Sequence, residues 1–128
     1  MSCVLRASGT DFDVDAFCAS TELPVVAKRR AGLDSGVPGR SSINIHVSDA
    51  GFSNLPRQIE DAVAFLERYG NDVRGLLAFR GVESAELDFG IQRRNVVAQT
   101  DSFPARLVSL TGALGVGITV SQYEICED

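Results

Sequence analysis

This sequence has little of the side-chain chemistry from which catalytic sites are usually recognised. Its 128 residues include one histidine, His46, no tryptophan, and three cysteines. No pair or triad of reactive side chains stands at a recognisable spacing. The cysteines (Cys3, Cys18 and Cys126) form no C-x-x-C pair and are odd in number, so they predict neither a zinc finger nor a disulfide framework. We therefore predict no metal site and no cofactor.

Long apolar runs and a surplus of positive charge are also missing. The longest uninterrupted apolar runs are only a few residues, too short for a helix that spans a membrane. Residues 1–7 lack the apolar segment of a secretory signal, so we expect a cytoplasmic protein. The net charge of −5 excludes the basic footprint of a protein that wraps duplex nucleic acid, and it favours a cationic partner. We expect neither nucleic acid nor membrane among the partners.

What the sequence does contain is a clear amphipathic pattern. Apolar residues make up 45% of the chain, enough for residues 1–128 to form a single domain with its own core. A long helix is predicted over 54–78, because Pro56 falls in its first turn and an apolar stripe follows at helical period. Gly70-Asn71 interrupts this stripe and predicts a kink or a break.

Strands are predicted where apolar residues alternate with polar ones. The clearest is 42–48, in which Ile43, Ile45 and Val47 face inward while Asn44, His46 and Ser48 face outward. Residues 93–100 fit either a short strand or an extended connection. The Gly/Pro-rich segment 31–41 is predicted to be a flexible loop. The other predicted strands cover 2–8, 23–30, 82–89 and 116–123, with further helices near 11–20 and 104–114.

The resulting order, β-α-β-β-α-β-(β)-α-β, predicts an α+β fold. Its first six elements fit a ferredoxin-like split βαβ sandwich, to which an α-β unit is appended. Every predicted strand is apolar on one side only. We therefore expect a mixed, mostly antiparallel sheet of about five strands with the helices on one face.

One acidic segment has the spacing of a calcium-binding loop. Asp11, Asp13 and Asp15 alternate, and Glu22 falls at the twelfth position of such a loop. However, the sixth position is Ala16, where the sharp turn needs glycine, and a strand rather than a helix precedes the segment. We interpret Asp11 or Asp13 as the cap of a helix and Asp15 as a complement to its dipole.

The outward residues of the strands would together form one polar sheet face. This face is interpreted in three ways: as a surface open to water, as a surface for self-association or a partner, or as a shallow ligand or active site. The candidate binding residues are Arg6, Asn44, His46, Ser48, Glu86, Asp88 and Thr119.

His46 is the side chain best suited to acid–base chemistry near neutral pH. Ser48 shares its strand face but lies roughly 7 Å away at a rise of about 3.3 Å per residue, so the two side chains point in parallel. Glu86 and Asp88 lie on the outer face of another strand and could approach the imidazole. The enzyme alternative is therefore a small hydrolase or isomerase with His46, Glu86 and Asp88 as candidate catalytic residues, set against a solvated sheet histidine.

Both ends of the chain resemble a known family. The segment 8–13, S-G-T-D-F-D, follows the first strand and resembles the opening signature of an uncharacterised bacterial family, domain of unknown function four-two-seven-nine. The far end is similar at Phe103-Pro104, Leu107, Leu110, Leu114-Gly115 and residues 118–123. Members often carry a tryptophan near the middle strand, which this chain lacks. The resemblance implies no established activity and no catalytic residues.

The leading functional interpretation is a non-catalytic cytosolic binding domain that recognises a protein, with its own copy as one option. Small acidic families of the kind that this chain resembles are sometimes suggested to act as immunity or accessory proteins. One concrete version of this interpretation is an immunity-like or accessory protein that binds a cationic partner. The enzyme that uses His46 remains the alternative.

Overall fold

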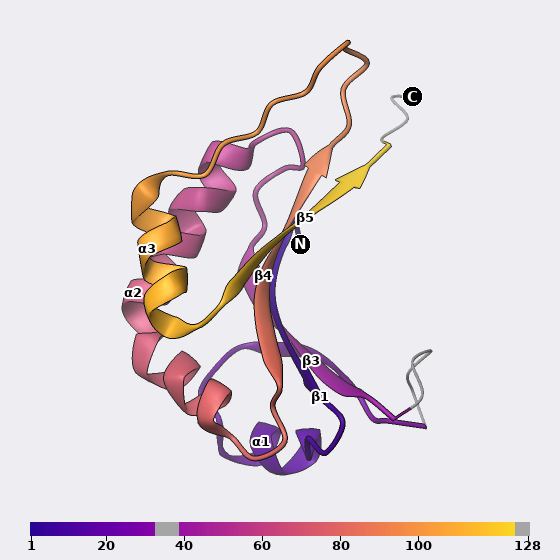
Figure 1. The fold of residues 1–128 in the computed structure, drawn as a ribbon, viewed down its shortest axis with the longest axis vertical. Helices are drawn as coiled ribbons and strands as arrows, with labels where there is room; N and C mark the ends of the chain where they lie inside the picture. The colour runs from indigo at the N-terminus through magenta and orange to yellow at the C-terminus, as the bar shows by residue number, and fades with distance from the viewer. Residues whose placement is uncertain (33–38, 125–128) are drawn as a thin grey trace.

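The computed structural model describes residues 1–32 and 39–124 (Figure 1). Most of the predicted loop 31–41 lies outside the described residues, as does Cys126. The elements in chain order are β1 (Cys3–Gly9), α1 (Val14–Ser20), β2 (Val25–Arg29), β3 (Ser41–Ser48), α2 (Leu55–Ala78), β4 (Ser84–Gln92), α3 (Ala105–Leu114) and β5 (Gly117–Tyr123).

The strands form one five-stranded mixed sheet in the order β2-β3-β1-β4-β5. The pairs among the first four strands are antiparallel, and β5 runs parallel to β4. Parallel neighbours need a crossover connection, and α3 lies within this one. The predicted α+β class and mostly antiparallel sheet are confirmed, with the first four strands in the order of a split βαβ plan.

The helices lie on one face of the sheet. Figure 1 shows α2 and α3 side by side against this face and α1 near one end of the sheet. A single core cluster joins the layers, with Leu5 and Leu87 from the sheet packed with Leu66 of α2 and Leu107 of α3. In the described part of the chain the opposite face carries no helix, and we call it the open face.

The helix ends follow the local chemistry of the sequence. The Asn54 side chain caps α2 by accepting a hydrogen bond from the backbone N–H of Arg57 at 3.2 Å. The predicted interruption of α2 is a kink at Tyr69, immediately before Gly70, with φ −108° and ψ 18°. Gly115 ends α3 in the left-handed conformation that glycine adopts readily, with φ 79°.

Several predicted boundaries are corrected. β4 continues to Gln92 rather than ending at Phe89, and β2 is shorter than predicted. Residues 93–100 form a connection without a strand, and the chain bends at 95–97. None of the helices within 1–32 and 39–124 is long and apolar enough to cross a membrane.

Candidate functional site

A network of charged and polar side chains spans the open face. Arg6 Nε donates a hydrogen bond to Asn44 Oδ1 at 3.1 Å, and Arg6 Nη1 donates one to Asp88 Oδ2 at 3.1 Å. The same Nη1 lies 3.5 Å from Glu86 Oε1. The Ser121 hydroxyl donates to the second Asp88 oxygen at 2.7 Å. Four neighbouring strands, β3, β1, β4 and β5, therefore contribute to one network.

The register of the strands explains this arrangement. Arg6 on β1 is paired with Asn44 on β3 and with Glu86 on β4, so these three residues form one row across the sheet. Asp88 is two residues further along β4 and therefore projects from the same face. It is only 9% exposed, and a carboxylate this buried needs partners that compensate for lost hydration. Arg6 and Ser121 supply them.

An aromatic pair borders this network at one end. The rings of Phe52 and Tyr123 meet edge to face with their centroids 5.4 Å apart. Phe52 can approach β4 because residue 90 is glycine: a Cβ there would lie 2.8 Å from Phe52 Cε1 and 2.9 Å from the Ser2 carbonyl oxygen. The pair and the network bound a shallow hollow of about 160 Å³.

We define the open-face cluster by the residues that share this network and this border. Its members are Arg6, Asn44, Phe52, Glu86, Asp88, Ser121 and Tyr123.

His46 does not join the open-face cluster. Its Nε2 lies 3.1 Å from Asp49 Oδ2, a distance typical of an ion pair. This neighbouring imidazole lowers the pKa of Asp49. On the sheet, His46 pairs with Val4, whose β4 partner is Asp88. Two strand spacings, about 9.6 Å, therefore separate the His46 and Asp88 backbones.

The candidate catalytic constellation is therefore not assembled. Among the described residues no hydrogen bond joins His46 to Glu86 or to Asp88. His46 instead lines a separate hollow of about 290 Å³ between β3 and α2, to which Asp61 and Tyr69 also contribute.

The prediction that Ser48 lies on the open face is wrong. Consecutive residues of β1 pair with Ser48 and His46, so Val47 is an extra residue that forms a β-bulge. The bulge interrupts the alternation of sides along β3. Ser48 is buried and donates a hydrogen bond to Asp61 Oδ2 on α2 at 2.7 Å.

The remaining candidate, Thr119, lies where the register predicts. It pairs with Asp88 across β4 and β5 and is half-buried. Within the described ranges its side chain makes no hydrogen bond. Sequence reasoning did not select Phe52 or Tyr123 for this site. Tyr123 could have been found, because it alternates with Thr119 and Ser121, whereas Phe52 comes from a loop without periodicity.

Among the described residues, neither Cys3 nor the acidic segment offers a reactive site. Burial, followed by the nearby Asp88 and Asp61 carboxylates, raises the pKa of the Cys3 thiol, so this thiol stays protonated and is a poor nucleophile. In residues 1–32 and 39–124, no three His, Cys, Asp or Glu side chains are grouped so that they could hold a metal ion. Asp13 caps α1 by accepting from the Ala16 N–H at 3.0 Å, which confirms the capping interpretation.

Comparisons with protein-family models, with curated proteins and with solved structures find no match to this chain. The resemblance to domain of unknown function four-two-seven-nine therefore stays a prediction from the sequence.

Proposed function

We propose that this chain is a non-catalytic protein-binding domain that binds its partner through the open-face cluster. The observation that carries the proposal is the Arg6–Asp88 network, which fixes charged side chains on a sheet face that no described helix covers. Side chains that are already ordered lose less conformational entropy when a partner binds.

The composition of the cluster supports a protein partner. Arginine and aromatic residues are enriched in the centres of protein interfaces. Tyr123 is 49% exposed beside the Arg6 network, so its ring can be covered further by a partner. The hollow of about 160 Å³ is small beside ordinary small-molecule pockets, which favours contact with a surface over enclosure of a metabolite.

Charge favours a cationic partner. In the Arg6 network one guanidinium faces two carboxylates, Glu86 and Asp88. The whole chain carries a net charge of −5, so the field of the molecule attracts positive surfaces. An immunity-like or accessory role in the cytoplasm is part of this proposal. The enzyme alternative receives no comparable support, because His46 stands apart from both carboxylates.

The proposal is tested by affinity capture from cells of the source organism, followed by binding measurements with the purified captured protein. We expect Tyr123→Ala to weaken this binding at least about tenfold, as for an interface hot spot. The matched control is Val108→Ala on α3, which also truncates an exposed apolar side chain. It should retain wild-type affinity.

A second measurement tests the charge argument. Glu86→Gln removes a carboxylate from the cluster but keeps its shape, so it should weaken the complex and reduce its sensitivity to salt. A partner that binds Tyr123→Ala and Glu86→Gln as tightly as the wild type would show that the open-face cluster is not the binding surface. Sedimentation of the protein alone distinguishes self-association from binding to another chain.

A further inference from the structure

The edge strand β2 offers a second surface, away from the open-face cluster. It stands at the end of the sheet and pairs only with β3 among the described residues. Within the described ranges, alternate backbone N–H and C=O groups along its outer side therefore have no strand partner. Such an edge is a template on which a further strand can add.

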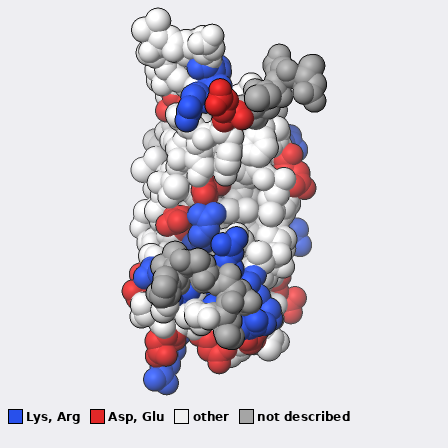
Figure 2. Space-filling model, turned by 90° about the vertical axis from the view of Figure 1, so that its right-hand side faces the viewer, with Lys and Arg blue, Asp and Glu red and all other residues white. Residues whose placement is uncertain are grey.

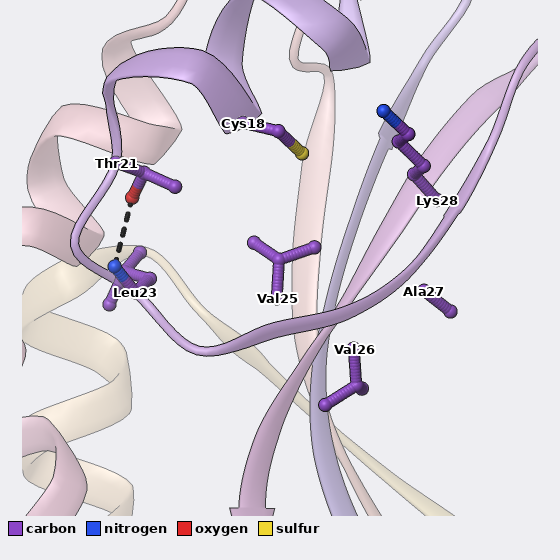
Figure 3. Close-up of a pocket in the computed structure, with 7 residues that line it drawn as sticks. All are labelled: Cys18, Thr21, Leu23, Val25, Val26, Ala27 and Lys28. Carbon is purple, nitrogen blue, oxygen red and sulfur yellow. Dashed lines mark hydrogen bonds between the residues drawn. The ribbon is translucent and has the colours of Figure 1, made fainter.

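A groove lies beside this edge. It has a volume of about 480 Å³ and runs between α1 and β2 (Figure 3). Cys18, Leu23 and Val25 line it with apolar surface, and Figure 3 shows Val25 and Cys18 on opposite sides of the space. Val26, on the same strand, is 48% exposed. The apolar surface between α1 and the sheet thus continues to the open edge of β2.

The register of β2 determines what an added strand would meet. Val25 and Lys28 pair with the inward-facing Ile45 and Ile43, so they lie on the helix side of the sheet. Residues of an added strand that point to this side would enter the groove. The alternate residues would lie on the open face beside Ala27 and Arg29, because side chains change sides at each residue of a strand.

The charge at this edge is opposite to that of the whole chain. Lys28, Arg29 and Arg30 follow one another at the end of β2. Asp15 of α1 accepts hydrogen bonds from both Lys28, at 2.6 Å, and Arg30, at 3.0 Å. Figure 2 shows Lys and Arg side chains gathered in the lower half of the open side of the molecule.

We infer that the β2 edge and its groove bind an extended acidic segment of a partner protein by strand addition. Its apolar side chains would fill the groove at alternate positions, and the carboxylates between them would lie on the open face beside Arg29. Backbone hydrogen bonds would supply affinity and the groove would supply selectivity. This inference does not rest on the open-face cluster. The competing explanation is that the bulge at Val26 and the cations shield the edge from other strands.

The test titrates the full chain with two capped peptides of about seven residues, the length of an ordinary strand. One peptide alternates valine with glutamate and the other alternates valine with lysine. Backbone amide NMR shifts should change along β2 and α1 with the glutamate peptide. The lysine peptide should bind at least about tenfold more weakly.

Matched variants locate the site. Val26→Glu and Val120→Glu place the same charge at exposed valines on the two edge strands, β2 and β5. Val26→Glu should reduce binding of the glutamate peptide at least about tenfold, while Val120→Glu should leave it unchanged. Arg29→Glu should reverse the preference between the two peptides. Tyr123→Ala should have no effect, which separates this site from the open-face cluster.

Three results would overturn the inference. The first is that neither peptide shifts the β2 amides, as expected if the edge is only shielded. The second is that both valine variants respond alike. The third is a dimer of the free protein that Val26→Glu dissociates, because the occupant of the edge would then be a second copy of this chain.

Discussion

Single residues on α3 show how burial sets the cost of a substitution. Leu107 is fully buried in the core, whereas its neighbour Val108 is 51% exposed. We expect Leu107→Ala to lower the free energy of unfolding by about 2–5 kcal/mol, through lost burial and a residual cavity. Val108→Ala should change it by less than about 0.5 kcal/mol. Urea denaturation of both variants measures the difference, and similar losses would show that the assigned face of α3 is wrong.

Glu83 links stability to pH at the residue scale. Hydrogen bonds from the Thr10 hydroxyl and backbone N–H, and then the Arg40 guanidinium, hold the pKa of Glu83 below its ordinary value of 4.5. A lowered folded-state pKa stabilises the protein above pH 4.5, and this contribution is lost as the pH falls through the folded-state pKa.

Between neutral pH and about pH 3 we therefore expect the melting temperature of Glu83→Gln to fall less than that of the wild type. The reason is that a glutamine side chain takes up no proton in this range. Glu22→Gln, at an exposed position, is the control and should follow the wild-type curve. A Glu83→Gln curve parallel to the wild type would mean that these hydrogen bonds do not favour the charged form in solution.

Individual site residues were predictable where strand alternation holds. The two-residue alternation along the strands alone placed four of these residues on one face, and the structure brings them together: Arg6, Asn44, Glu86 and Asp88. Ser48 was misplaced because a bulge leaves no signal in apolar–polar alternation. Which carboxylate Arg6 contacts could not be predicted either, since it depends on the pairing of β1 with β4.

At the level of elements, the carboxylates at the start of α1 serve the helix and its neighbours rather than a calcium ion. Asp13 caps the helix, and Asp15 pairs with Lys28 and Arg30. The two carboxylates therefore have separate partners and do not converge on one cation site. We expect added calcium and added chelator to leave the melting temperature unchanged. A specific site would raise stability by about 2.7 kcal/mol at a hundredfold excess over Kd. Differential scanning fluorimetry measures the melting temperature. A melting temperature that rises with calcium but not with chelator would contradict the capping interpretation.

Elements with a clear period were predicted in type and order, whereas their ends depended on tertiary contacts. β4 was expected to end at Phe89, before Gly90, where glycine weakens a strand but does not end this one. It continues because Gly90 makes room for the Phe52 ring and donates a backbone hydrogen bond to the Ser2 carbonyl oxygen at 2.7 Å. A single glycine therefore extends the strand on which part of the open-face cluster stands.

For the whole molecule, charge is divided between two surfaces. The chain carries −5 overall and presents an excess of carboxylate in the Arg6 network, yet the β2 edge carries consecutive cations. Composition alone predicts a single preference for cationic partners. The fold adds a second preference, because Glu86 and Asp88 stand on β4 beside β1, whereas the consecutive cations stand at the end of the edge strand β2.

The appended α3–β5 unit shares its core with the rest of the molecule. Phe103 packs on Phe89 with ring centroids 5.1 Å apart, and Leu107 belongs to the same core cluster as Leu66. Because this core is shared, we expect the unit to unfold together with the rest of the chain in one transition, as for a single domain.

The absence of tryptophan makes this measurable, since Tyr69 on α2 and Tyr123 on β5 are the only tyrosines. In Tyr69→Phe, tyrosine fluorescence reports β5 alone, and in Tyr123→Phe it reports α2 alone. Each variant should give a urea midpoint by fluorescence that equals its own midpoint by far-ultraviolet circular dichroism. If the Tyr123 signal changes at lower urea than the helical signal, α3 and β5 unfold as a separate unit, and the chain is not one cooperative domain.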